Sequence, residues 1–407
     1  MGVQLGAGHL APQTKPSKNP HGIETVVEGR DIPTVYGQAF LTEQEYPLDY
    51  QHGAIPLCSS GEMDILARWC ATPRIKSPGR KNIVFLDTET SGLAGGTGTY
   101  AFLVGIGYLA ETGFHLNQFF MRDPGQETAL LAALDQWLSG FDVIVTFNGK
   151  SFDVPLLNTR FIMNGFTTPF NRFEHVDVLQ IARKLWRDRL PSRALGELEK
   201  EIVRFYRTTD DIPGWMIPQI YFDYLHNGDA RPISSIFYHN AIDILSLAAL
   251  FGRIGEMLKD PLQNASEYGL DLAAIARLYE EMGMLEEAVD LYEQSLNLGD
   301  LPEPFFLKTM ERYASLRRRQ QDWDKAVQIW QKAAEYGHMA ACIELSKYYE
   351  HRERNFTEAL DWARKALDAL DYSGSNVYSV KAIERDIQRR IGRLYQKTYR
   401  TFNHRSS

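Results

Sequence analysis

The 407 residues of the chain, 44% of them hydrophobic and 24% charged, are enough for two or three compact units with sizeable cores. A formal net charge of −8 argues against a surface coated in positive potential, but it leaves nucleic-acid binding open, because such binding depends on local patches and metal ions. The three cysteines have no metal-ligand spacing, and neither a signal peptide nor an apolar run of about 20 residues is visible, which argues against disulfides and a membrane span and favours the cytoplasm.

The first 80 residues carry few signals of regular structure. Residues 1–22 are rich in glycine, proline and polar residues, and we expect a disordered tail. Residues 23–80 contain short apolar stretches broken by glycine and proline. We interpret them as an extended, partly β segment that wraps a neighbouring domain and ends in a linker.

From Asn82 the pattern changes to buried strands that alternate with helices. Apolar runs that predict strands lie at 83–86, 101–107, 114–121 and 143–147, and periodic runs that predict helices lie at 127–138 and 154–163. Strands first, followed by alternation with helices, indicate a mixed central sheet covered on both faces. We therefore predict an α/β domain over residues 81–256.

A repeated phrase marks the last third of the chain, where strand patterns disappear. Alanine-containing copies stand at 288–292, 326–330 and 359–363, spaced close to the ~34-residue helix-turn-helix unit of tetratricopeptide repeats. Small alanines let paired helices approach closely, and three units would bury a continuous face. We predict an all-α repeat domain over 257–372, with a surface for a protein partner, and a basic C-terminal helix and tail over 373–407. Its basic residues either cap the repeats or contact nucleic acid.

Two acids follow the first predicted strand. Asp87 and Glu89 come directly after 83–86 and, being two residues apart on a strand, project from the same face. Adjacent carboxylates repel each other unless a cation joins them, and hard divalent ions such as Mg²⁺ or Mn²⁺ prefer oxygen ligands. Alone, this pair is equally well explained as a surface Asp-x-Glu.

Two further acids join the pattern. Asp153 follows the strand 143–147 at the head of a helix, and Asp243 lies in a helical pattern whose apolar residues would pack on the sheet. In isolation, Asp153 is better explained as a helix cap and Asp243 as a solvated helix residue. When all four acids are considered jointly, these separate explanations are much weaker, and a shared metal site is favoured.

The spacing of these acids resembles a known superfamily. Asp-x-Glu after the first strand, Asn-x3-Phe-Asp after the fourth and an acid in a late helix are similar to the DEDD superfamily of 3′→5′ exonucleases. The phrases at 86–93, 98–105, 211–214 and 239–247 resemble the bacterial YprB-type ribonuclease-H-like family, in which repeats also follow. The resemblance covers about residues 24–252. It implies a ribonuclease-H-like nuclease with two Mg²⁺ or Mn²⁺ ions, held by Asp87, Glu89, Asp153 and Asp243.

The resemblance also calls for a general base beside the last acid. In the superfamily this is a His five residues before the Asp or a Tyr four residues before it, whereas here Tyr238 stands at minus five and His239 at minus four. His239 and Asp243 are one helical turn apart and share a face. A His with a pKa of about 6.5 is a better base at neutral pH than a Tyr of about 10. We choose His239 and keep Tyr238 as the alternative.

Several polar residues are candidates for substrate contact. The glycine-rich segment 92–100 either touches a strand end or forms a flexible turn. A basic run after residue 179 suits a phosphate-tracking surface, although a solvated helix face is the commoner meaning of such a run. The candidates are Thr97, Thr99, Asn148, Tyr238, Arg183 and Arg187.

Three functions remain open. The first is a metal-dependent 3′→5′ exonuclease on DNA or RNA, the second a binding scaffold with a decayed nuclease fold, and the third an endonuclease that cuts internally. All four acids and a candidate base are present, which favours an enzyme. A base beside the last acid favours removal of terminal nucleotides.

Overall fold

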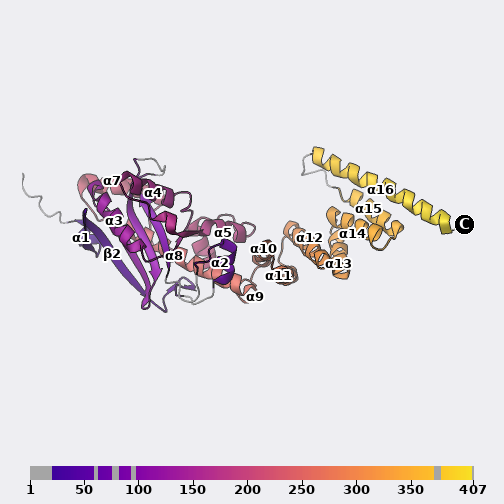
Figure 1. The fold of residues 1–407 in the computed structure, drawn as a ribbon, viewed down its shortest axis with the longest axis horizontal. Coiled ribbons are helices and arrows are strands. Elements are labelled where there is room, and N and C mark those ends of the chain that lie inside the picture. Colours follow the sequence, from indigo (N-terminus) through magenta and orange to yellow (C-terminus); the bar gives the residue numbers. More distant parts are fainter. Residues whose placement is uncertain (1–20, 59–62, 76–81, 93–97, 371–376, 406–407) are drawn as a thin grey trace, which may run out of the picture. The chain divides into compact units, whose positions relative to one another are not determined.

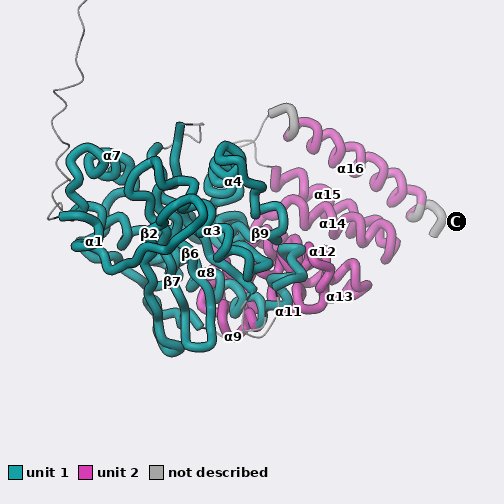
Figure 2. The backbone as a smooth tube through the Cα atoms, turned by 60° about the vertical axis from the view of Figure 1, so that its left-hand side comes forward, with its two compact units in different colours: residues 1–259 teal, residues 260–407 magenta. Residues whose placement is uncertain are grey.

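The computed structural model describes residues 21–58, 63–75, 82–92, 98–370 and 377–405. The chain divides into two compact units, residues 1–259 and 260–407 (Figure 2). Unit 1 is α/β, whereas the regular structure of unit 2 is all helical among its described residues, which confirms the predicted fold class. All three cysteines are free, and among the described residues no helix combines the length and apolar character needed to cross a bilayer.

Unit 1 is built on a seven-stranded sheet in the order β1-β2-β7-β6-β5-β8-β9. Figure 1 shows strand β2 beside helix α3 (Glu127–Leu138). The strands are β1 (Arg30–Thr34), β2 (Gly37–Pro47), β5 (Ile83–Thr90), β6 (Ala101–Leu109), β7 (Gly113–Phe120), β8 (Val143–Thr146) and β9 (Glu174–Asp177), with β3 (Gln51–His52) and β4 (Ile55–Pro56) forming a separate pair. Strands β5, β8 and β9 are mutually parallel, and the other pairings are antiparallel. The carboxyl ends of the three parallel strands therefore meet at one edge of the sheet.

The segment interpreted as an extended wrap supplies two strands of this sheet. Strand β2 pairs antiparallel with β7 from Phe40 to Pro47, and β1 pairs with β2. Phe40 and Leu41 are buried, so β2 contributes to the core and not only to the ladder. Compact unit 1 therefore begins well before the boundary predicted at residue 81.

Helices cover both faces of the sheet. They are α1 (Ile23–Val26), α2 (Asp64–Cys70), α3 (Glu127–Leu138), α4 (Asp153–Met163), α5 (Val178–Trp186), α6 (Leu195–Leu198), α7 (Ile217–Asn227) and α8 (Ile233–Lys259), with short turns η1 (Pro124–Gln126), η2 (Phe170–Arg172), η3 (Glu199–Val203, a π-helix) and η4 (Gly214–Met216). Helix α3 packs against β2 and β7, where Phe119 and Trp137 make an edge contact. Helix α8 packs against β5 and β6, where Phe85 contacts Phe251. Because side chains alternate along a strand, the residues of β5 on the Phe85 side all face α8.

Unit 2 contains helix pairs at the positions of the repeated phrase. After α9 (Pro261–Asn264) come α10 (Gly269–Glu281) with α11 (Leu285–Leu298), α12 (Glu303–Arg319) with α13 (Trp323–Glu335), α14 (Met339–His351) with α15 (Phe356–Asp368), and finally α16 (Val377–Arg405). The repeated alanines Ala288, Ala326 and Ala359 begin the same phrase in the second helix of each pair, and each is 0% exposed. Close approach of the paired helices thus depends on a small side chain at each of these positions.

Three cations of the basic helix α16 converge on one carboxylate of α14. Arg390, Arg393 and Lys397 bond Glu350 at 2.7, 3.0 and 2.9 Å, and the side chain of Glu350 is 0% exposed. Burial of this carboxyl raises its pKa, but the hydrogen bonds from Arg393 and Lys397 outweigh burial and lower the pKa of Glu350 to about 2. These three basic residues therefore hold the terminal helix on the repeats.

We expect Glu350→Gln to destabilise unit 2 by roughly 1.5–3 kcal/mol at neutral pH, because it removes charge-assisted hydrogen bonds between a buried carboxylate and three partly exposed cations. The folded pKa lies below the ordinary 4.5. The ion-pair contribution is therefore complete above about pH 4.5 and is lost as the pH falls towards 2. Urea unfolding followed by circular dichroism measures the free energy of unfolding at pH 7 and pH 3. Glu335→Gln, at an exposed position, is the control. Equal stability of Glu350→Gln and the parent at pH 7 would contradict the prediction.

Candidate active site

Two of the four predicted acids lie at the end of β5, on the face covered by α8. Asp87 stands opposite Gly105 of β6, and Glu89 stands opposite Leu103. The register shifts directly after Glu89, and an irregularity of this kind bends a strand and re-aims its last side chains. Asn240 of α8 donates a hydrogen bond to Oδ2 of Asp87 at 2.9 Å, so the helix holds the first acid in place.

Gly105 makes this contact between helix and strand possible. A Cβ atom at Gly105 would lie 2.2 Å from Oδ1 of Asn240, a distance that real side chains do not tolerate. The same Oδ1 accepts a hydrogen bond from Gln118 at 3.0 Å, and Asn240 is fully buried. Both ends of the Asn240 amide are thus bonded, which fixes the direction of its donor towards Asp87.

The third acid reaches the cluster from the first turn of α4. Asp153 accepts a 2.5 Å hydrogen bond from Oγ1 of Thr88, the residue between the two acids of β5, and burial raises the pKa of Asp153 to about 6. The loop before α4 is held by Asp177 at the end of β9, which accepts the backbone N–H groups of Asn148 and Lys150 at 2.8 and 3.2 Å. Asn148 adopts a φ of +65°, a left-handed conformation that Asn tolerates better than most residues. Asp177 therefore sets the path of the chain from β8 to Asp153.

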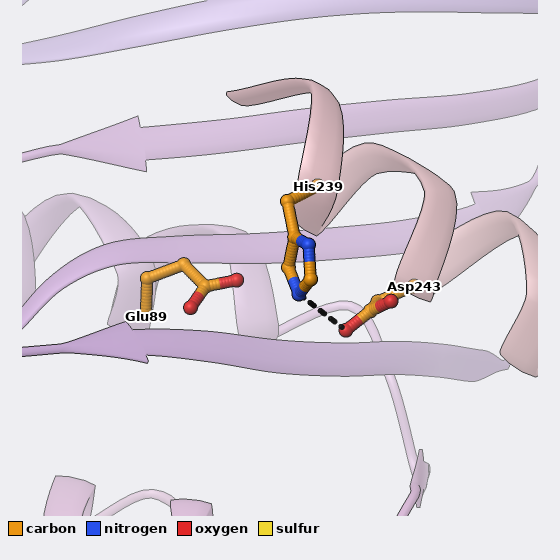
Figure 3. A group of neighbouring side chains, drawn as sticks. All are labelled: Glu89, His239 and Asp243. Atoms are coloured by element: carbon orange, nitrogen blue, oxygen red, sulfur yellow. Dashed lines mark ion pairs between the residues drawn. The ribbon is translucent and has the colours of Figure 1, made fainter. Parts of the chain in front are cut away.

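The fourth acid and the candidate base lie one turn apart on α8. Figure 3 shows the side chains of Glu89, His239 and Asp243 directed towards one another. Nε2 of His239 lies 3.6 Å from Oδ2 of Asp243, and one potential ligand atom from each of the three residues lies within 4.8 Å of the others. Glu89 and Asp243 are therefore close enough to share a cation, with Nε2 of His239 beside them.

The acids are close enough to perturb one another. Burial, followed by the charges of Asp243 and Asp153, raises the pKa of Asp87 well above its ordinary value. Burial and the charge of Asp87 have the same effect on the pKa of Glu89. Ionising all four carboxylates is costly unless a cation compensates them. The carboxylate oxygens of these residues are the donors that Mg²⁺ or Mn²⁺ prefers.

One cation among the acids was not identified from the sequence. Arg207 donates hydrogen bonds to Glu199 and Asp243, and it also lies 3.4 Å from Oδ1 of Asp211. Asp211 contacts Nδ1 of His239 at 2.7 Å. Asp211 belongs to a phrase that supported the family resemblance, but Arg207 lies in an irregular segment with no periodicity to mark it.

The predicted substrate residues are divided between the site and other surfaces. Asn148 and Arg183 line a cleft of about 460 Å³ together with Asp87 and Asp243, and Arg193 lies on the same wall. A second cleft of about 560 Å³ also contains Asp243 and is lined by His239, Arg207, Lys200 and Tyr206. The cations Arg183, Arg193 and Lys200 thus accompany the acids along the two clefts.

The other predicted substrate residues lie elsewhere or are not described. The hydroxyl of Tyr238 accepts a hydrogen bond from Oγ1 of Thr208 at 3.1 Å. Arg187 is exposed and contacts Asp188 at 3.3 Å, and it is absent from the described linings of both clefts. Thr99 is 8% exposed, and Thr97 lies outside the described residues.

Comparisons with known proteins identify the family of the chain and its two kinds of domain. Residues 84–254 match the family model of the RNase_H superfamily, and residues 272–303 match a tetratricopeptide repeat. Unit 1 is thus a ribonuclease-H-superfamily domain with a nuclease-like fold, and a repeat domain follows it. The chain is also 30% identical over 377 residues to "Uncharacterized protein YprB" of Bacillus subtilis (strain 168). This match covers 88% of this chain and 86% of that protein. The chain belongs to the YprB family, which confirms the resemblance seen in its sequence motifs.

A solved structure with a similar part is the family B DNA polymerase from the hyperthermophilic archaeon Pyrobaculum calidifontis. The match has 14% sequence identity and a TM-score of 0.34, and it covers 62% of this chain. The chain spans 33% of the polymerase. A likeness at this level carries no argument about function.

Proposed function

We propose that the protein is a divalent-metal-dependent nuclease that removes nucleotides from the 3′ ends of DNA or RNA. The observation that carries this proposal is the convergence of four carboxylates in one partly buried cluster. Ligand atoms of Glu89 and Asp243 lie within 4.8 Å of each other and of His239, and the charges of Asp87 and Asp153 act on the same group. Such a cluster is costly to keep ionised without cations, and strained or costly arrangements concentrate at functional sites.

The four carboxylates would hold two Mg²⁺ or Mn²⁺ ions. Bound ions of this kind supply an activated water and stabilise the leaving oxygen of a phosphodiester. The protein contributes fixed ligand positions, because Asn240 holds Asp87 and Thr88 holds Asp153. Ligands oriented in advance do not have to reorganise when the substrate arrives.

His239 is the group that we assign as general base. Its Nδ1 lies 2.7 Å from Asp211, a carboxylate that can only accept a hydrogen bond when it is ionised. Nδ1 also lies 3.3 Å from Nη1 of Arg207, which can only donate, but its shorter contact is with Asp211. We therefore assign the proton to Nδ1, so that the lone pair of Nε2 faces Glu89 and Asp243, where it would take the proton of an attacking water. The hydroxyl of Tyr238 is engaged by Thr208 instead, which supports His239 as the base.

The cations of the two clefts supply contacts for a phosphate backbone. Arg183 and Arg193 line one cleft and Lys200 lines the other, and Asp243 belongs to both linings. Basic side chains along a groove position nucleic acid without reading its sequence. We assign the helical repeats to a protein partner, since stacked repeats form extended binding surfaces.

The proposal is tested with the purified full-length protein, Mn²⁺ or Mg²⁺, and single strands labelled at the 3′ end. We expect the label to be released as mononucleotides, and a circular single strand of the same sequence to stay intact. Long labelled fragments, or opening of the circle, would favour the endonuclease. Absence of cleavage of DNA, RNA and hybrid substrates would contradict the proposal and favour a scaffold built on a nuclease fold.

A further inference from the structure

Arg207 is anchored from one side by a buried carboxylate. Its Nε donates to Oε2 of Glu199 at 2.7 Å, and its Nη2 donates to the other oxygen of the same carboxylate. Glu199 opens the π-helix η3, and its side chain is 2% exposed. Two parallel hydrogen bonds between a guanidinium and a carboxylate fix direction as well as distance. The position of the Arg207 guanidinium is therefore determined by η3.

The same guanidinium also holds one oxygen of Asp243. Nη2 of Arg207 donates to Oδ1 of Asp243, and the side chains are 16% and 17% exposed. The second oxygen, Oδ2, is the one that lies 3.6 Å from Nε2 of His239, on the side of Glu89. Asp243 thus has one oxygen bonded to the protein and the other directed into the carboxylate cluster.

We propose that Arg207 is a positioning residue that, anchored on Glu199, fixes Asp243 so that only Oδ2 is presented to a divalent cation. This inference rests on the proposed function, because it assumes that the cluster binds such ions. Polar partners behind a metal ligand orient it, and their loss typically weakens metal binding 10- to 100-fold. Lysine would not replace Arg207, because an ammonium group lacks the planar fork that spans two carboxylates.

The test measures Mn²⁺ binding to the full-length protein, without substrate, by electron paramagnetic resonance of free Mn²⁺ and by calorimetry. We expect Arg207→Gln to weaken Mn²⁺ binding by about 10- to 100-fold, and Arg207→Lys to restore little of it. Glu199→Gln keeps the guanidinium but removes its anchor, and should also weaken binding. The double variant should bind no worse than Arg207→Gln alone, because both changes break one chain of contacts.

A second buried arginine provides a matched control. Arg160 of α4 makes two hydrogen bonds to Glu127 of α3, at 2.5 and 2.6 Å, and their side chains are 5% and 9% exposed. Arg160→Gln should lower the thermal stability of the protein yet leave Mn²⁺ affinity within about twofold of the parent, since the described contacts of this pair are with Asn164, Met163 and Tyr100. Circular dichroism checks that every variant is folded. If Arg207→Gln does not fold, Glu199→Gln still tests the inference.

Each outcome decides the matter. Mn²⁺ affinity that is unchanged in folded Arg207→Gln or Glu199→Gln would overturn the inference, as would tighter binding, which would make Arg207 a competitor of the cation. An equal loss of Mn²⁺ affinity in Arg160→Gln would show that Arg207 has only a structural role, and it would also overturn the inference. Failure of the unsubstituted protein to bind Mn²⁺ would contradict the proposed function together with the inference, whereas binding by the parent with no effect at Arg207 would leave the proposed function standing.

Discussion

Asp87→Asn is expected to lower the rate of metal-dependent strand cleavage by more than about 100-fold. Losing a residue that only hydrogen-bonds a metal ligand already lowers activity by up to about 100-fold, and Asp87 is itself a proposed ligand. Asn at this position can still accept the hydrogen bond that Asn240 donates to Asp87, so the fold should be kept. The change removes one charge from a cluster whose members raise the pKa of Asp87. The metal-free variant should therefore unfold at a higher temperature than the parent.

This pair of opposite effects separates a functional cluster from a structural one. Initial rates on a 3′-labelled strand and thermal unfolding in the presence of a chelator measure the two effects on the same samples. Asp135→Asn, on an exposed residue of α3, serves as control and should change neither quantity. Cleavage by Asp87→Asn at the parental rate would remove Asp87 from the proposed mechanism.

His239→Gln is expected to lower kcat by roughly 10²- to 10⁴-fold, the range that general bases contribute. Tyr238→Phe should stay within a few-fold of the parent, because its hydroxyl bonds Thr208 and not the acids. Single-turnover rates for the two variants under saturating Mn²⁺ separate loss of the base from loss of metal affinity. An inactive Tyr238→Phe beside an active His239→Gln would reverse our assignment.

Local patterns were sufficient to predict most of the sheet and the pairing of two acids. Alternation along a strand places Asp87 and Glu89 on one face whatever the rest of the fold does. The parallel pairing of β5 with β8 then brings Asp153 to the same edge, since Asp153 follows β8 by a short loop. The repeated alanines likewise predicted helix pairs because close packing requires small side chains.

Other features depend on contacts between distant residues and left no local mark. Arg207 lies in an irregular segment, and its role follows only from the proximity of Glu199 and Asp243 in the folded chain. The bond from Asn240 to Asp87 requires a glycine on a third element, at residue 105. Strands β1 and β2 were not predicted as part of the sheet because glycine and proline interrupt the residues around them. Strand β2 joins the sheet through its pairing with the distant strand β7.

We propose that carboxylates from β5, α4 and α8 together bind divalent cations. Anomalous diffraction from crystals grown with Mn²⁺ tests it most directly, because it locates the ions without reference to activity. We predict anomalous peaks bounded by Asp87, Glu89, Asp153 and Asp243, and no peak at that position in Asp87→Asn. Well-ordered crystals that show Mn²⁺ elsewhere, or none among these four side chains, would contradict the account.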